Sequence, residues 1–227
     1  MEVRISGVHY PLETLGPGRR LGVWFQGCSL ACAGCMSRHT WDTRGGTPVQ
    51  VPDVLARWEA ALAAGAAGLT VSGGEPLQQA DALAELLAGA DRLRGASRRE
   101  RGAAGAAPVD LLVYTGYEFE ELTPGQRHAL SYADAVVTGR FRVAEPTRLV
   151  WRGSANQRIR PLTPRGAVRY GPHLARETDG ARLQVETGTE SPAAVRVYGV
   201  PLRGEMTWME RRLKESGVTL SERSWRP

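Results

Sequence analysis

Cysteine is scarce in this chain, and its placement excludes whole classes of protein. The 227 residues include three cysteines, Cys28, Cys32 and Cys35, and all three lie within one stretch of eight residues. A disulfide scaffold needs an even set of cysteines spread along the chain, so that class is not indicated. The stretch also lacks the second pair of ligands that structural zinc sites normally use.

Other absences narrow the class of protein further. Lysine occurs once, at Lys214, so arginine carries nearly all of the positive charge behind the formal net charge of +5. The arginines are scattered, apart from those in residues 98–101, which favours a solvated loop over a nucleic-acid surface. A phosphate-binding loop of the G-x-x-x-x-G-K type is missing, which argues against a nucleotide triphosphatase.

Long apolar runs are also missing. No stretch approaches the roughly 20 apolar residues of a membrane-spanning helix, so no membrane association is expected. The amino-terminal residues do not combine a basic region with an apolar core, as a signal peptide would. We therefore expect a cytoplasmic location, where free thiols stay reduced.

The pattern of apolar residues predicts strands that alternate with helices. Short apolar runs bounded by glycine and proline are typical of buried strands, whereas a period of 3.6 is typical of helices. We expect strands at residues 3–8, 21–25, 69–72, 109–114 and 135–138, and helices at 52–64, 78–93 and 124–132. Residues 95–108 and 148–161 are predicted to be loops, and 182–186 and 195–200 a hairpin around the turn 188–192, followed by a helix over 204–216.

This order predicts an α/β fold with a parallel sheet and crossover helices. A full eight-stranded barrel typically needs about 250 residues, so we expect a partial (β/α)6-type TIM barrel. Residues 1–160 would form its core. Residues 161–227 would form a C-terminal extension of a β-hairpin and a helix, packed on the core.

The three cysteines form a C-x3-C-x2-C pattern, which points to a metal centre. A four-iron, four-sulfur cluster normally takes four thiolates, so three would leave one iron with an open position for chemistry. Other interpretations stay open. His39 could complete a zinc site of the Cys3His type, Cys32 and Cys35 could form a redox pair, and a cluster could serve electron transfer alone.

A second motif follows the strand predicted at 69–72. Ser72, Gly73, Gly74 and Glu75 would lie at the same edge of the sheet as the cysteine loop, because parallel strands end at one edge. The glycines allow close approach to a ligand, whose carboxylate could meet backbone N–H groups while Glu75 meets an ammonium group. A ligand with both groups is an amino acid, although a plain strand-to-helix turn explains the same residues.

Together these motifs resemble the radical S-adenosylmethionine enzymes. Further segments narrow the resemblance to the enzymes that activate glycyl radical enzymes; these are Gly16–Arg19 before Trp24–Cys28, and Thr40–Gly46. Three more segments resemble most the anaerobic ribonucleotide reductase activating branch: Tyr114–Tyr117 with Glu121–Leu122, Thr138–Phe141, and Trp151–Arg158. Gly34, before the third cysteine, replaces an aromatic residue common in the superfamily and agrees with this branch.

The resemblance implies a mechanism in which cofactors carry the chemistry and no side chain is catalytic. A [4Fe-4S] cluster would cleave S-adenosyl-L-methionine reductively to a 5′-deoxyadenosyl radical. The radical would abstract hydrogen from a glycine of a partner glycyl radical enzyme, with a flavodoxin or ferredoxin-type protein as reductant. The implied metal ligands are Cys28, Cys32 and Cys35, and the implied cofactor-binding residues are Ser72, Gly73, Gly74, Glu75, Thr115, Tyr117 and Asn156.

The extension keeps a second function open. Residues 161–227 match no motif of the branch, and elements near a barrel mouth often set substrate choice. The alternative is a radical S-adenosylmethionine enzyme that acts on a small molecule, nucleoside or short peptide in a biosynthetic pathway. The absence of further cysteines argues against an auxiliary cluster in either case.

Overall fold

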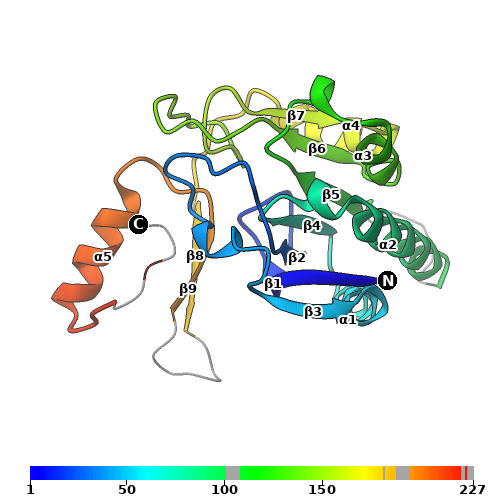
Figure 1. Ribbon diagram of the computed structural model, residues 1–227, viewed down its shortest axis with the longest axis horizontal. Helices are drawn as coiled ribbons and strands as arrows, with labels where there is room; N and C mark the ends of the chain where they lie inside the picture. The colour runs from blue at the N-terminus through cyan, green and yellow to red at the C-terminus, as the bar shows by residue number, and fades with distance from the viewer. Residues whose placement is uncertain (101–107, 181, 188–194, 221–222, 224–227) are drawn as a thin grey trace.

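The computed structural model describes residues 1–100, 108–180, 182–187, 195–220 and 223, which form a mixed α/β fold around a central sheet (Figure 1). The sheet has seven strands in the order β3-β1-β2-β4-β5-β6-β7, and β8 pairs with β9 in a separate hairpin. The central strands are Glu2–Leu12 (β1), Arg20–Phe25 (β2), Thr47–Gln50 (β3), Gly68–Gly73 (β4), Asp110–Tyr114 (β5), Ala135–Thr138 (β6) and Arg158–Pro161 (β7). The hairpin strands are Leu183–Thr187 (β8) and Val195–Gly199 (β9).

The described residues also form five α-helices and four 3-10 turns, and α5 follows the last strand. The helices are Val51–Ala63 (α1), Ala80–Glu100 (α2), Pro124–Ala129 (α3), Pro164–Tyr170 (α4) and Glu205–Glu215 (α5). The 3-10 turns are Arg38–Thr40 (η1), Pro76–Gln79 (η2), Phe119–Glu121 (η3) and Gly171–His173 (η4). None of the helices in the described ranges is both long and apolar enough to cross a lipid bilayer.

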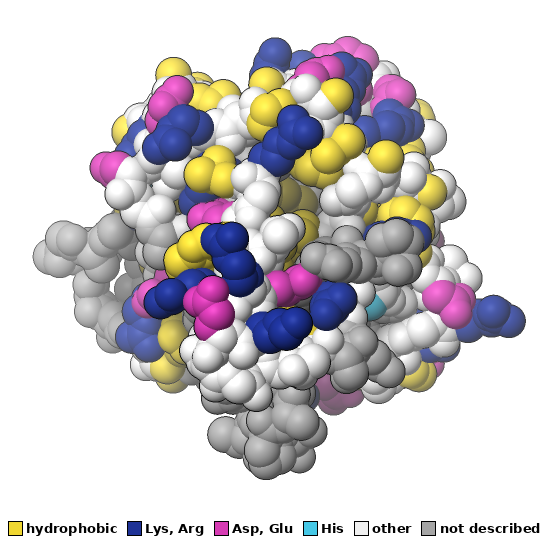
Figure 2. All heavy atoms as spheres, turned by 90° about the vertical axis from the view of Figure 1, so that its left-hand side faces the viewer, with side chains coloured by type: hydrophobic (Ala, Val, Ile, Leu, Met, Phe, Trp, Pro, Cys, Tyr) yellow, Lys and Arg dark blue, Asp and Glu magenta, His cyan; other side chains and the backbone are white. Residues whose placement is uncertain are grey.

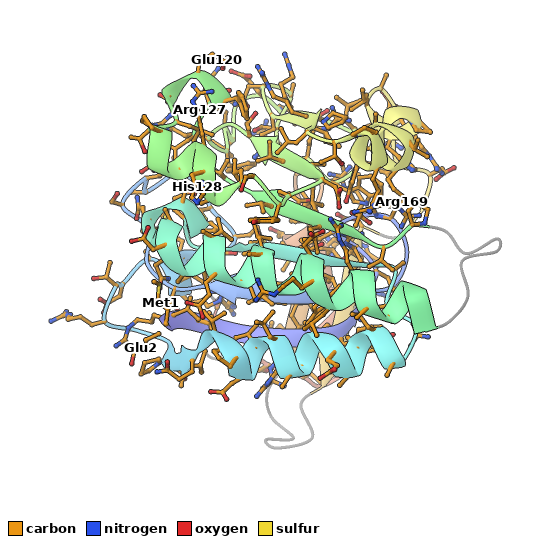
Figure 3. All side chains as sticks on the ribbon, turned by 90° about the vertical axis from the view of Figure 1, so that its right-hand side faces the viewer. Met1, Glu2, Glu120, Arg127, His128 and Arg169 are labelled. Atoms are coloured by element: carbon orange, nitrogen blue, oxygen red, sulfur yellow. The ribbon has the colours of Figure 1, made fainter. Side chains whose placement is uncertain are left out.

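The four central strands β2, β4, β5 and β6 run parallel, which confirms the predicted parallel sheet with helical crossovers. Figure 3 shows α1, α2 and α3 side by side on one face of this sheet. Strand β1 pairs antiparallel with β2 and with the edge strand β3, and the edge strand β7 pairs antiparallel with β6. The sequence analysis missed β3 and β7, each four residues long, and assigned β7 to the predicted loop at 148–161.

Helix α1 starts and packs as its sequence predicts. Gln50 and Asp53 form a capping box at its first turn, and Pro52 suits a position where no backbone donor is needed. Trp58 is fully buried, and its indole N–H donates to the carbonyl of Ala90 on α2 at 3.2 Å. Trp58 is thus a packing residue that fixes α1 against α2.

Helix α2 is longer than its periodicity predicts. It continues to Glu100, so its last turns occupy the start of the segment predicted as a loop at 95–108. Residues 101–107 of that segment lie outside the described residues. Arg94 explains the extension, because its guanidinium holds this part of the helix to Asp91 on the same helix and to Asp134 before β6.

A network of buried charges joins the amino-terminal ends of the parallel strands. Arg20 on β2 and Asp110 on β5 are fully buried and form a two-pronged ion pair with both distances at 2.9 Å. Arg20 also donates to the hydroxyl of Thr70 on β4. The Tyr170 hydroxyl, at the end of α4, donates to Asp110 as well. The network therefore ties three strands and α4 together away from the cysteines.

The predicted C-terminal hairpin and helix are confirmed as β8, β9 and α5. The predicted turn at 188–192 lies outside the described residues. Figure 1 shows the hairpin and α5 on the side of the sheet opposite α1 and α2. Arg182, just before β8, is buried and donates to the carbonyl oxygens of Val200, Arg148 and Arg152, which fastens the hairpin to the loop before β7.

Candidate functional site

The cysteine loop follows β2 at the carboxyl end of the parallel strands, as predicted. Cys28, Cys32 and Cys35 are free and partly buried. The backbone takes a positive φ at Gly27 and Gly34, a conformation that glycine adopts without a steric cost. Burial is the main cause that raises the pKa of the Cys28 and Cys32 thiols above the ordinary value.

Backbone and glutamine hydrogen bonds hold the two ends of this loop together. Gly27 N–H donates to Thr40 O at 2.7 Å, and Cys28 N–H donates to Trp41 O at 3.1 Å. The side-chain amide of Gln26 donates to the carbonyl oxygens of His39 and Asp42. The loop is therefore closed by bonds that belong to the chain itself.

The Gly73-Gly74-Glu75 turn lies directly against the start of the cysteine loop. Gly74 N–H donates to Phe25 O at 2.8 Å, and Glu75 N–H donates to Gly27 O at 2.9 Å. A Cβ atom on Gly74 would lie 2.3 Å from the Gly27 carbonyl oxygen, and one on Gly73 would lie 2.4 Å from Phe25 O. Only glycine permits this contact, which brings the two predicted motifs into one site.

This arrangement limits which groups of the turn can meet a ligand. The backbone N–H groups of Gly74 and Glu75 are both engaged within the protein, so neither is free for the ligand carboxylate that N–H groups of the turn were predicted to meet, while the predicted contact of Glu75 with an ammonium group stays a prediction. The reason is the close contact between the turn and the cysteine loop. Contacts from the turn to an amino acid would instead come from its carbonyl oxygens and from the carboxylate of Glu75, which attract an ammonium group.

Glu75 links the ends of β4 and β5. Its carboxylate is 1% exposed and accepts hydrogen bonds from the Thr115 hydroxyl at 2.8 Å, from Gly116 N–H at 2.7 Å and from Leu77 N–H at 3.0 Å. Burial raises the pKa of Glu75 to about 7, and these three hydrogen bonds oppose that rise. The carboxyl group of Glu75 therefore has a pKa close to neutral pH.

A cavity of roughly 990 Å³ joins these groups. Its wall includes the three cysteines and the predicted residues Ser72, Gly73, Gly74, Glu75 and Thr115. The predicted Tyr117 and Asn156 are not among its lining residues. The Tyr117 hydroxyl accepts from Gln78, and Asn156 donates to Arg140 O and accepts from Ser154. These two residues order the loops around the cavity.

The sequence analysis missed several residues that build the site. Gln78 holds the cysteine loop through both Ser29 N–H and the Ser29 hydroxyl, and Gln79 pairs with the backbone of Arg4 on β1. Phe141 and Tyr198 line the cavity from loops and strands far along the chain. No local pattern marks Gln78 and Gln79, because their partners lie about 50 to 75 positions away.

The donor set fits a cluster better than a single metal ion. Within the described ranges, no three His, Cys, Asp or Glu side chains converge as one bound ion would require, which gives no support to a Cys3His zinc site. In a cluster, each thiolate binds a different iron. Three thiols on one loop, beside a cavity large enough for a further ligand, agree with that arrangement.

Comparison with known proteins agrees with this site. Residues 14–160 match the family described as "4Fe-4S single cluster domain". The anaerobic ribonucleoside-triphosphate reductase-activating protein of Haemophilus influenzae is 35% identical over 160 residues, which cover 66% of this chain and 94% of that protein. The protein of the same name from bacteriophage T4 is 31% identical over 153 residues, or 66% of this chain and 89% of that protein.

A comparison of structures gives a slighter likeness. The crystal structure of QueE from Escherichia coli matches with a TM-score of 0.38 and 17% identity, over 63% of this chain and 74% of that chain. The sequence matches cover about nine tenths of those relatives, and the family match includes the cysteine loop and the Gly-Gly-Glu turn of this chain. The chain therefore belongs to the single-cluster 4Fe-4S family of anaerobic ribonucleoside-triphosphate reductase-activating proteins.

Proposed function

We propose that this protein activates an anaerobic ribonucleotide reductase-like glycyl radical enzyme. When bound, the [4Fe-4S] cluster supplies one electron that splits S-adenosyl-L-methionine into methionine and a 5′-deoxyadenosyl radical, which takes a hydrogen atom from a glycine of the partner. The observation that carries this proposal is the hydrogen-bonded contact between the cysteine loop and the Gly73-Gly74-Glu75 turn on one cavity.

The residues of the site have distinct tasks in this proposal. Cys28, Cys32 and Cys35, which line the cavity, would hold the cluster through three thiolates, one ligand fewer than a cluster normally takes. The turn from Ser72 to Glu75 attracts the ammonium group of the methionine end. Thr115 fixes the Glu75 carboxylate, while Tyr117 and Asn156 keep the surrounding loops in place for the nucleoside end.

We further propose that the sheet works as an open, partial barrel of the (β/α)6 type. Two features support this interpretation: the crossover helices α1 to α3 lie on one face, and the cavity lies at the carboxyl ends of the parallel strands. Residues 1–160 supply the cofactor site, and residues 161–227 act as an extension packed on it.

We also propose a class of reductant and a cellular location for this protein. The cluster needs one electron for each turnover, so a small electron carrier of the flavodoxin or ferredoxin type is the expected partner. A partner reductase of nucleotide metabolism and free thiols both favour the cytoplasm. We propose no role in nucleic-acid binding.

The test uses the anaerobically reconstituted protein with dithionite, S-adenosyl-L-methionine and the partner enzyme from the same organism. We expect 5′-deoxyadenosine by chromatography and a glycine-centred signal in the partner by electron paramagnetic resonance. Deuterium at the partner glycine should move into 5′-deoxyadenosine. Cys32→Ala should abolish all three results, whereas Ser131→Ala, at an exposed position outside the site, should retain them.

Two results would contradict the proposed function, each in a different part. If the wild-type protein carries its full iron and sulfide content but forms no 5′-deoxyadenosine, the proposed cleavage is wrong. If 5′-deoxyadenosine forms while no deuterium leaves the partner, the target is not the proposed glycine, and the small-molecule alternative takes its place.

A further inference from the structure

Strand β9 of the C-terminal hairpin forms one wall of the cavity. A continuous run of residues from Val195 to Pro201 lines it, together with the three cysteines and the Gly-Gly-Glu turn. No residue of β8 does so. The family match ends at residue 160, so this wall lies outside the matched part of the chain.

The edge of β9 that faces away from β8 carries unpaired backbone groups. In an antiparallel pair, hydrogen-bonded and non-hydrogen-bonded residue pairs alternate. Val200 N–H donates to Arg182 O at 3.2 Å, which makes Val195 and Val197 members of non-hydrogen-bonded pairs. Their N–H and C=O groups therefore point away from β8, and no hydrogen bond within the described part of the chain engages them.

The hairpin is fixed firmly enough to present this edge in one position. The ring of Tyr198 stacks on His9 of β1 at 4.3 Å between ring centroids and lies 5.0 Å from that of Trp24 on β2. Gln184 on β8 donates to Pro11 O at 2.8 Å, and Glu186 lies 3.1 Å from the His9 ring nitrogen. These contacts hold both strands of the hairpin to the core, so little order has to be gained on binding.

Charge does not identify the ligand of this edge. Figure 2 shows the side of the molecule that carries the hairpin and α5, and basic and acidic side chains are interspersed over it. The regular feature is instead the row of peptide groups at alternate residues of β9, which is complementary to another extended backbone.

Resting on the proposed function, we propose that the free edge of β9 binds an extended segment of the partner glycyl radical enzyme as an added strand. Main-chain hydrogen bonds to Val195 and Val197 would align the segment along the cavity wall and carry its glycine toward the cluster side. Glycine suits this task, since a residue without a side chain can approach the site closely. The β9 edge is thus a positioning surface for a polypeptide substrate.

The hairpin offers a matched pair of variants for the test. Val197→Pro removes an N–H group on the free edge of β9, while Val185→Pro removes the equivalent group on the opposite edge of the hairpin, because the two residues face each other in the register. Neither change removes a hydrogen bond between β8 and β9. Val197→Ala keeps the N–H group and reports on the side chain alone.

Two activities of the reconstituted holoenzyme are compared in each variant. Formation of 5′-deoxyadenosine without partner is measured in each variant, because Val197 lines the cavity and an effect on the cofactor site must be separated from an effect on the partner. With the partner, Val197→Pro should raise the KM for the partner about three- to tenfold, the usual effect of losing one backbone hydrogen bond. Val185→Pro and Val197→Ala should leave this KM near the wild-type value.

The outcomes separate this inference from the proposed function. If Val197→Pro and Val185→Pro raise the KM equally, or if neither raises it, strand addition at β9 is wrong while activation itself stands. If Val197→Pro also abolishes formation of 5′-deoxyadenosine without partner, the edge serves the cofactor site and the inference again fails. If wild type yields no radical in the partner, the proposed function fails first.

Discussion

At the scale of single residues, the site depends on two glycines, because a side chain at either position would not fit. Gly73 and Gly74 allow β4 to end against the cysteine loop, where two backbone carbonyl oxygens occupy the space of a Cβ atom. Glu75 then reaches Thr115 and Gly116 at the end of β5. Gly73, Gly74 and Glu75 thus determine how the ends of β4 and β5 meet the cysteine loop at the cavity.

Gly74→Ala should damage the cysteine loop. A methyl group 2.3 Å from Gly27 O forces the turn and the loop apart. We expect a loss of about 1–3 kcal/mol in the free energy of unfolding and a lower iron content after reconstitution. Gly125→Ala is the matched control, since nothing lies within 4 Å of its added methyl group. Equal iron content in both variants would refute the role of this contact.

Glu75 should give the stability of the cluster-free protein a distinctive pH dependence. Its pKa is about 7 in the folded protein and has its ordinary value of 4.5 in the unfolded chain. Between these values the folded protein binds a proton that the unfolded chain has lost, so stability is full below about pH 4.5 and falls as the pH rises to 7. The full change is about 3 kcal/mol.

Urea denaturation across this pH range checks the prediction for Glu75. Glu75→Gln cannot ionise, so the difference in unfolding free energy between wild type and variant should change across the window by about the amount stated. A constant difference would show that Glu75 keeps an ordinary pKa.

At the scale of elements, the buried ion pair of Arg20 and Asp110 joins β2, β4 and β5. Burial opposes ionisation of Asp110, but the Arg20 guanidinium outweighs it and lowers the Asp110 pKa. Asp110→Asn would leave Arg20 buried without its counter-charge, so we expect a loss of about 3–5 kcal/mol in unfolding free energy. Guanidinium denaturation measures this loss.

A surface pair supplies the control for this prediction. Asp42 and Arg44 form an ion pair with exposed side chains, so Asp42→Asn should have no measurable effect on unfolding. If Asp110→Asn is equally harmless, the three strands do not depend on the buried pair.

The strands also show how much of the fold could be predicted from the sequence. Strands β2, β4, β5 and β6 were predicted, because a central parallel strand is an apolar run buried on both faces. Edge strand β3 is mostly exposed and β7 only partly buried, so neither has such a run. The cysteines and the Gly-Gly-Glu turn were found from local spacing, whereas Gln79 and Tyr198 act through partners far along the chain.

At the scale of the whole molecule, the segment after residue 160 has two parts with different ties to the core. Helix α4 is integral, since Tyr170 is fully buried and bonds to Asp110, and Thr163 donates to Asp134 at 2.7 Å. Helix α5 lies beyond the hairpin, farther from the sheet (Figure 1). The predicted boundary at residue 160 therefore raises a testable question, which is whether the chain up to that residue folds without α4.

Two truncations test this claim. A chain that ends at residue 160 loses the Tyr170 contacts, worth about 3–5 kcal/mol for a buried aromatic side chain, and should not unfold cooperatively. A chain that ends at residue 203 keeps α4 and the hairpin, and it should retain a cooperative thermal transition by circular dichroism. A cooperative, equally stable chain ending at 160 would instead support an independent core.

The closure of the cysteine loop by chain-internal bonds has a consequence for how the protein survives air. Many small metal proteins unfold when their metal leaves, because the metal supplies the folding energy. Here hydrogen bonds of Gln26, Thr40 and Trp41, which belong to the chain itself, close the loop. After oxygen destroys the cluster, the cysteine loop should therefore keep its fold. A new cluster should then assemble on the same polypeptide under anaerobic conditions.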